Sequence, residues 1–166
     1  MEGKPPEILP VKSLPATDAR PLHPNLPKPP ALLLMISPIR TGKSTIISNL
    51  LLNSNFFGQD FFDETIVFSP TIHNDKTSRF LRKAATCYDT YSDDTLQGII
   101  DDQSSYEDKS MRPSIALILD DIIGVFKGKG GREPMINSLC SRFRHYGIDL
   151  LLMSSQNYRG VNPVIR

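Results

Sequence analysis

The chain has 166 residues, of which 39% are hydrophobic, and a formal net charge of +1. A chain of this length and apolar content can bury one core, which excludes wholesale disorder. Its apolar runs all fall short of the ~18 residues of a membrane span, and its total charge does not mark it as a nucleic-acid binder. Two cysteines, Cys87 and Cys140, are too few for a disulfide framework or a Cys-based zinc site, so we expect buried thiols and an intracellular location.

Proline divides the sequence into two parts. Nine of the 14 prolines lie in residues 1–30, and proline fixes φ and lacks an N–H, so this stretch is neither a regular helix nor a central strand. We expect a Pro-rich N-terminal arm or linker over 1–30 and a folded domain over 31–166. The arm is either a disordered leader or a segment that packs on a neighbouring subunit, and the sequence leaves both open.

From residue 31 onward, apolar runs alternate with helical patterns. Strands are predicted at 31–36, 64–69, 114–119 and 148–153, and helices at 43–53, 75–84, 93–103 and 134–144. The first strand is an unbroken apolar run, so it should be buried on both faces, and Phe80 and Leu81 should face the core. The alternation favours an α/β fold with a mainly parallel sheet covered on both faces. Ligands of such sheets bind at the carboxyl ends of the strands.

The loop after the first predicted strand carries most of a P-loop. Gly42-Lys43-Ser44 matches the end of the pattern Gly-x4-Gly-Lys-Ser/Thr between a strand and a helix, while Ser37 replaces the first glycine. Serine is disfavoured there if the position requires positive φ. Lys43, which we expect to be exposed in the empty loop, would contact the β- and γ-phosphates, and Ser44 would ligate Mg²⁺. The predicted cofactors are ATP and Mg²⁺, bound by Ser37, Pro38, Ile39, Arg40, Thr41, Gly42, Lys43, Ser44 and Thr45.

Polar side chains follow two further strands. The strand at 114–119 runs into Asp120 and Asp121, the arrangement of a Walker B motif. Asp120 is the candidate for holding Mg²⁺ through a coordinated water. Asp121 would act as general base on the attacking water, or it merely caps the following turn. After the last strand, Gln156 is placed to orient that water beside the γ-phosphate.

Together these motifs resemble the genome-packaging ATPase of nucleocytoplasmic large DNA viruses, the poxvirus type, within the FtsK–HerA class. The resemblance covers roughly residues 31–166 and is carried by Pro38 with Thr41-Gly42-Lys43-Ser44, by Leu117-Ile118-Leu119-Asp120-Asp121, and by Arg144-His145-Tyr146-Gly147-Ile148 with Ser154-Ser155-Gln156. It implies a three-layer P-loop NTPase fold of the ASCE type, a homo-oligomeric ring, and ATP-driven movement of double-stranded DNA into a capsid. It also implies capsid or portal components as partners, and a location in the virion or at the viral assembly site in the host cytoplasm.

By motif position, the resemblance assigns phosphate and Mg²⁺ binding to Lys43 and Ser44, the Walker B acid to Asp120, the catalytic acid to Asp121 and the polar sensor to Gln156. Members of this class continue through at least one more strand, beside the P-loop strand. We therefore expect that the fold lacks its C-terminal strand or strands. The Pro-rich arm or the apolar residues near Val161 would then cover the free flank of 31–36.

Basic residues gather after residue 121. Residues 122–166 hold two acidic residues and seven basic ones: Lys127, Lys129, Arg132, Arg142, Arg144, Arg159 and Arg166. The Gly-rich stretch 127–132 is either a loop that contacts the DNA backbone or a solvated loop. Arg142, Arg144 and Arg159 either reach a neighbour's ATP or form local ion pairs.

Two other functions compete with a packaging motor. A P-loop kinase of a small substrate would need a lid with catalytic arginines, which the sequence does not show clearly. A nucleotide-binding assembly protein without turnover fits the replacement of the first P-loop glycine by Ser37. ATP turnover with and without double-stranded DNA separates the three functions.

Overall fold

The computed structural model describes residues 23–122 and 135–157. Predictions for the first 22 residues, for the Gly-rich basic stretch, for Pro134 and for residues 158–166 lie outside the described residues. In chain order the elements are β1 (Ala31–Ile36), α1 (Lys43–Leu52), β2 (Glu64–Phe68), η1 (Thr77–Arg79), α2 (Leu81–Ala84), β3 (Thr86–Tyr88), α3 (Asp93–Ser104), η2 (Lys109–Met111), β4 (Ile115–Asp120), α4 (Met135–Arg142) and β5 (Ile148–Ser155), where η marks a 3₁₀ turn.

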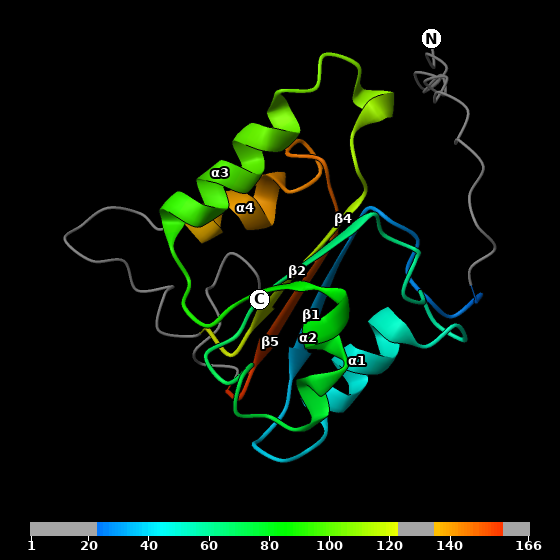
Figure 1. The fold of residues 1–166 in the computed structure, drawn as a ribbon, viewed down its shortest axis with the longest axis vertical. Helices are drawn as coiled ribbons and strands as arrows, with labels where there is room; N and C mark the ends of the chain where they lie inside the picture. The colour runs from blue at the N-terminus through cyan, green and yellow to red at the C-terminus, as the bar shows by residue number, and fades with distance from the viewer. Residues whose placement is uncertain (1–22, 123–134, 158–166) are drawn as a thin grey trace, which may run out of the picture.

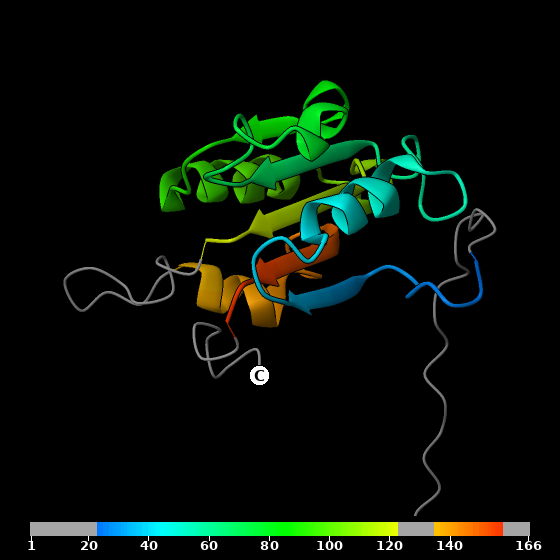
Figure 2. The same cartoon turned by 90° about the horizontal axis from the view of Figure 1, so that it is seen from below.

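The strands form one parallel sheet in the order β1-β5-β4-β2-β3. Helices α1 and α2 lie on one side of this sheet, and α3 and α4 on the other (Figures 1 and 2). The predicted α/β fold with a covered parallel sheet is therefore confirmed. The four predicted strands and the helices α1, α3 and α4 all form near their expected bounds.

Alternation along the central strand explains why both faces are covered. In β4, Leu117 and Leu119 point into the core shared with α3 and α4, while Ala116 and Ile118 point into the core shared with α1 and α2. All four side chains are fully buried. Because successive side chains of a strand point to opposite faces, an unbroken apolar run is stable only between two helical layers.

The expectation that the first strand is buried on both faces is wrong. Within the described residues β1 pairs with β5 alone, so it lies at an edge of the sheet, and only Ala31 is fully buried. Leu32, Leu33 and Leu34 are half-buried, and Ile36 is exposed. Among the described residues, the outer flank of β1 has no strand partner.

The region predicted as one helix over 75–84 is broken. A 3₁₀ turn, η1, precedes the four-residue helix α2, and the chain becomes extended at Ala85. Leu81 is buried as expected, but Phe80 is 65% exposed because it lies at the junction of the two short elements. The extended chain then forms β3, which pairs with β2 and was not predicted.

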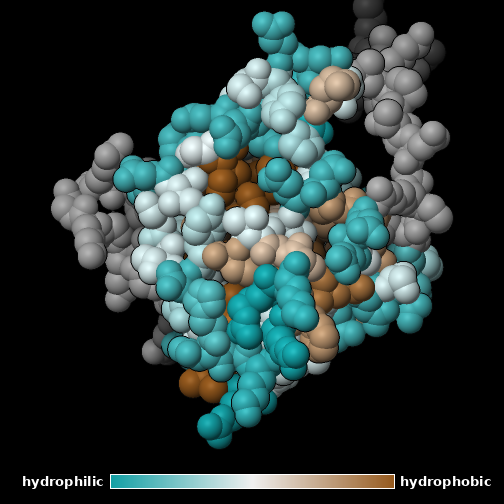
Figure 3. Space-filling view, in the orientation of Figure 1, coloured by the Kyte–Doolittle hydropathy of each residue, from teal (hydrophilic) through white to brown (hydrophobic). Residues whose placement is uncertain are grey.

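Hydrophilic residues cover most of the face seen in Figure 3, and hydrophobic residues show mainly near its centre, between the two helical layers. Across residues 23–122 and 135–157, none of the helices combines the length and the apolar character needed to cross a bilayer.

Candidate functional site

A cavity of about 670 Å³ lies where β1, β2, β4 and β5 end. Its lining joins the three predicted motifs to a fourth segment after β2. The lining residues are Ile39, Arg40, Gly42, Lys43, Ser44, Thr45, Thr71, Asn74, Asp75, Thr77, Asp121 and Gln156. The rule that ligands bind at the carboxyl ends of parallel strands thus locates the cavity correctly.

The P-loop between β1 and α1 is held together by hydrogen bonds between its own residues. Gly42, the residue before α1, has φ +93°, which glycine adopts without steric cost. The other left-handed residue in this loop is Arg40, with φ +63°; Ser37 is not left-handed, so its replacement of glycine does not strain the backbone. The Thr41 hydroxyl lies 2.8 Å from Ser37 Oγ and 2.7 Å from the Pro38 carbonyl oxygen, which ties the loop together.

Lys43 is not exposed, contrary to the sequence-based expectation. Its side chain is only 8% exposed, because it folds back over the loop. The ammonium donates to the carbonyl oxygens of Ser37 at 2.9 Å and Pro38 at 3.4 Å, and it lies 4.0 Å from Asp121 Oδ2. A buried ammonium is stable only with such partners. Ser37 and Pro38 therefore contribute through their carbonyl groups and, with Thr41, do not line the cavity.

Asp121 faces the cavity from the end of β4. Its backbone is left-handed, with φ +52°, and its N–H donates to the Ser154 carbonyl at 3.2 Å, which turns the chain out of the sheet. Gln156 Nε2 donates to Asp121 Oδ2 at 2.9 Å. The other carboxylate oxygen, Oδ1, is buried and has no hydrogen-bond partner within the part of the chain that the structure describes. Asp121 therefore has one oxygen held in place by Gln156 and one buried oxygen without a hydrogen-bond partner among the described residues.

Asp120 lies beneath the cavity rather than in its lining. It is the last residue of β4 and is 8% exposed. Its Oδ2 accepts a hydrogen bond from Ser69 Oγ at 2.9 Å, and its Oδ1 accepts one from Ser154 Oγ. Ser69 follows β2, and Ser154 lies near the end of β5. These two strands flank β4, so the buried carboxylate joins three strands below the cavity. Its role in holding Mg²⁺ through a water stays a prediction.

The segment after β2 is a wall of the cavity that the sequence motifs missed. Thr71, Asn74, Asp75 and Thr77 line it opposite the P-loop. A signal for this wall was present, since β2 ends at the same edge of the sheet as β1, β4 and β5. What the sequence could not show is that the chain turns back toward α1 at this point, where Ser48 Oγ meets the Thr77 carbonyl at 3.5 Å.

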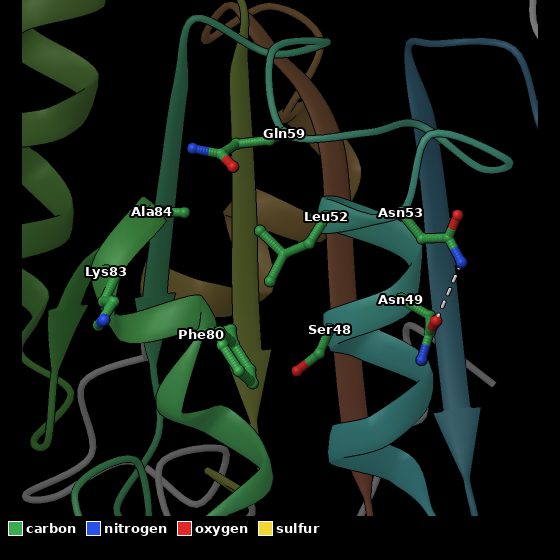
Figure 4. A pocket seen from close by; sticks show the side chains of 8 residues that line it. All are labelled: Ser48, Asn49, Leu52, Asn53, Gln59, Phe80, Lys83 and Ala84. Atoms are coloured by element: carbon green, nitrogen blue, oxygen red, sulfur yellow. Dashed lines mark hydrogen bonds between the residues drawn. The ribbon is translucent and has the colours of Figure 1, made fainter.

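A second cavity, of about 550 Å³, lies between α1 and α2 (Figure 4). Side chains from both helices and from the loop after α1 border it: Ser48, Asn49, Leu52, Asn53, Gln59, Phe80, Lys83 and Ala84. None of the predicted site residues is among them. The candidate site is therefore the larger cavity at the strand ends.

A magnesium-bound nucleotide suits the donors and acceptors of that cavity. The ammonium of Lys43 and the N-terminus of α1 attract phosphate, and the Ser44 hydroxyl and carboxylate oxygens are ligands that Mg²⁺ prefers. The unpartnered Asp121 Oδ1 also indicates that a polar group or water belongs beside it. No group of three or more His, Cys, Asp or Glu side chains suited to a metal ion occurs in residues 23–122 and 135–157.

No known family model matches the sequence, and no curated protein does. Nine chains of solved structures match the fold. One of them, described as "The cytoplasmic domain of EssC", superposes with a TM-score of 0.55 at 14% sequence identity, over 82% of this chain and 31% of the other. The chain thus spans about a third of that structure's length, and at this identity the likeness shows the fold alone. The five-stranded parallel sheet, its two helical layers and this likeness establish an α/β fold of the P-loop NTPase type.

Proposed function

We propose that the chain is an ATPase that hydrolyses ATP with Mg²⁺ in the cavity at the strand ends. The observation that supports this most strongly is the state of Asp121, which has Oδ2 bound by Gln156 and Oδ1 free of hydrogen-bond partners among the described residues. A carboxylate in this position can accept a proton from a water molecule. Gly42, Lys43 and Ser44 of the P-loop line the same cavity.

The predicted catalytic and metal-binding residues each have a role in this proposal. Lys43 exchanges its contacts with Ser37, Pro38 and Asp121 for phosphate oxygens, and its charge stabilises the transferring phosphoryl group. Ser44 and, through a water, Asp120 hold Mg²⁺, which neutralises charge on the phosphates when it is bound.

Asp121 and Gln156 act on the water molecule that attacks the γ-phosphate. The Asp121 carboxylate accepts a proton from this water. Gln156 keeps Oδ2 of Asp121 in place, and its amide lies at the same wall of the cavity.

We further propose that ATP hydrolysis drives double-stranded DNA into a viral capsid, and that the chain does this as part of a homo-oligomeric ring. Support for this comes from the resemblance of the motifs to packaging ATPases of large DNA viruses. Arg142 and Arg144 are exposed, line no part of the chain's own cavity and form no ion pair within residues 23–122 and 135–157. They are therefore available to DNA or to a neighbouring subunit.

ATP turnover by the purified chain, measured with and without double-stranded DNA of unrelated sequences, tests this function. The proposal expects phosphate release that rises with DNA and falls as salt is added, because contacts with the DNA backbone are electrostatic. Transfer of phosphate to a small acceptor would indicate the kinase instead. Nucleotide binding without turnover in either condition would indicate the assembly protein.

A further inference from the structure

The cavity of about 550 Å³ between α1 and α2, called the α1–α2 groove below, has apolar walls with polar groups at its edges. The Phe80 ring and the Leu52 side chain point into the space between the two helices (Figure 4). Phe80 is 65% exposed, and Leu52 is half-buried. Because exposed aromatic side chains of this kind are enriched where proteins bind partners, the groove has the character of a docking surface.

The outer side of α1 also lacks charge. Residues 44–59, which include all of α1 after Lys43 and the loop that follows, hold no Asp, Glu, Lys or Arg, although 22% of the chain is charged. A helix that faces water on one side usually carries charged residues there, whereas the centres of protein interfaces are depleted of charge. Ile46 of this helix is nonetheless 50% exposed. The composition of α1 is therefore that of a helix covered on its outer side as well.

The groove offers hydrogen-bond donors that a ligand has to match. The side-chain amide of Gln59 and the ammonium of Lys83 have no hydrogen-bond or ion-pair partner within the part of the chain that the structure describes. Both groups donate hydrogen bonds, so a ligand with free acceptors suits them. The backbone of a polyproline II helix is such a ligand, because its carbonyl groups form no internal hydrogen bonds.

The Pro-rich arm has a sequence pattern that fits this groove. Proline favours the polyproline II helix, which has three residues per turn, so residues i and i+3 lie along the same edge. At this spacing one edge of residues 5–14 is wholly apolar, and it consists of Pro5, Ile8, Val11 and Leu14. The other two edges include the polar or charged residues Glu7, Lys12 and Ser13. Residues 5–14 thus carry a continuous apolar edge beside polar ones.

The described end of the arm leads to the side of the sheet where the groove lies. Leu26 packs against the apolar cluster beneath α1, which includes Ile47 and Leu51, and Leu52 of the groove packs against the same cluster. The arm therefore joins the folded domain on the α1 side of the sheet. The residues 15–22, between the apolar edge and His23, can span roughly 25 Å in a polyproline II conformation.

We propose that the apolar edge of residues 5–14 docks into the α1–α2 groove, with its side chains against Phe80 and Leu52. The charges of the two surfaces are complementary, because Glu7 is the one charged residue in 5–11 and Lys83 is the one charged residue that lines the groove. The inference does not depend on the proposed ATPase function, since the groove shares no lining residue with the cavity at the strand ends.

Limited proteolysis of the full chain by trypsin tests the docking. Within residues 1–22, Lys12 is the one cleavable site, because Lys4 and Arg20 each precede a proline, which blocks trypsin. A synthetic peptide of residues 1–22 gives the cleavage rate of the free arm. We expect the wild-type chain to be cut at Lys12 about tenfold more slowly than this peptide, since trypsin cuts only the released arm. Phe80→Ala should restore the rate of the free peptide.

Met111→Ala is the matched control on the folded domain. Met111 is 71% exposed and lies outside the groove, so its removal should leave the wild-type rate unchanged. Circular dichroism confirms beforehand that both variants are folded. A wild-type arm that is cut as fast as the free peptide shows that the groove has another occupant, such as a second copy of the domain, and overturns the inference. Equal rates for Phe80→Ala and Met111→Ala also overturn it.

Two neighbouring substitutions in the arm test the apolar edge itself. Ile8 lies on that edge and Leu9 does not. Ile8→Asn should therefore speed cleavage of the chain at Lys12, while Leu9→Asn should leave the wild-type rate, each compared with a free peptide that carries the same substitution. Equal effects of the two substitutions would contradict docking through this edge. Protection that is lost on dilution assigns the docked arm to a neighbouring subunit, and protection that persists assigns it to the same chain; both results support the docking.

Discussion

The ammonium of Lys43 lies 4.0 Å from Oδ2 of Asp121, although the strands that precede them, β1 and β4, are separated in the sheet by β5. The two side chains are 8% and 17% exposed, so solvent screens their attraction less than at an open surface. The contact connects the P-loop to the end of β4. A phosphate bound at the loop would compete with Asp121 for the Lys43 ammonium. Phosphate binding would therefore release the Asp121 carboxylate from its contact with Lys43.

Asp121→Asn should bind nucleotide and fail to hydrolyse it. An amide does not accept the proton of the attacking water, and loss of a general base costs roughly 10²–10⁴-fold in rate. The fold should tolerate the change, because asparagine adopts the left-handed backbone found at this position. Phosphate release and nucleotide affinity, measured on the same preparation, check this. Hydrolysis at the wild-type rate would assign the base to another group.

Asp120→Ala should act mainly on stability. The change leaves the buried hydroxyls of Ser69 and Ser154 without their acceptor, and each unsatisfied buried group costs about 1–3 kcal/mol. We expect a loss of at least about 2 kcal/mol in the free energy of unfolding by urea titration. Asp120→Asn, which keeps one acceptor oxygen, should lose less. Equal stability of Asp120→Ala and the wild type would show that the three-strand contact contributes nothing.

Two glycine-to-alanine substitutions should change the free energy of unfolding in opposite directions. Gly147 has φ +75°, and a Cβ there would lie 2.7 Å from Oε1 of the buried Gln103. Gly147→Ala should therefore lower the free energy of unfolding by about 1–2 kcal/mol. Gly98 lies inside α3 with open space around it, so Gly98→Ala should raise stability by about 0.5–1 kcal/mol. Thermal unfolding of both variants tests the pair, and a stabilised Gly147→Ala would refute the left-handed turn before β5.

Asp149 should make stability depend on pH. Burial raises the pKa of this carboxyl group above its ordinary value of 3.8, and the negative charge of Asp63 adds to that effect, while a hydrogen bond with Ser114 opposes it. Because the folded state holds the proton more tightly than the unfolded state, stability falls as pH rises through the shifted pKa. Asp149→Asn should consequently raise the melting temperature at neutral pH and give no gain below pH ~3.8. A gain that is the same at both pH values would refute the assignment.

The loop between β1 and α1 was predictable because it depends on local sequence. Gly42-Lys43-Ser44 follows an apolar strand and opens a helix, and the structure places all three at the cavity. Asp121 and Gln156 were also predictable, because each follows a parallel strand and ligands bind at the carboxyl ends of such strands. That part of the site follows from strand order in a parallel sheet.

The remaining features depend on contacts between distant segments. Lys43 is buried because the carbonyl groups of Ser37 and Pro38 turn toward it, which no residue pattern encodes. The three residues of β3 are too few to show a periodicity. Asp75 lines the cavity only because the segment after β2 folds back toward α1, so Asp75 belongs to no sequence motif.

Phosphate release from ATP by the wild-type chain and by Lys43→Ala tests the central claim most directly. The account predicts Mg²⁺-dependent release by the wild type, further raised by double-stranded DNA, and its loss in Lys43→Ala, because the only P-loop ammonium that lines the described cavity has been removed. Circular dichroism confirms beforehand that both chains are folded. Equal release by the two folded chains would contradict the assignment of this cavity as the site of ATP hydrolysis.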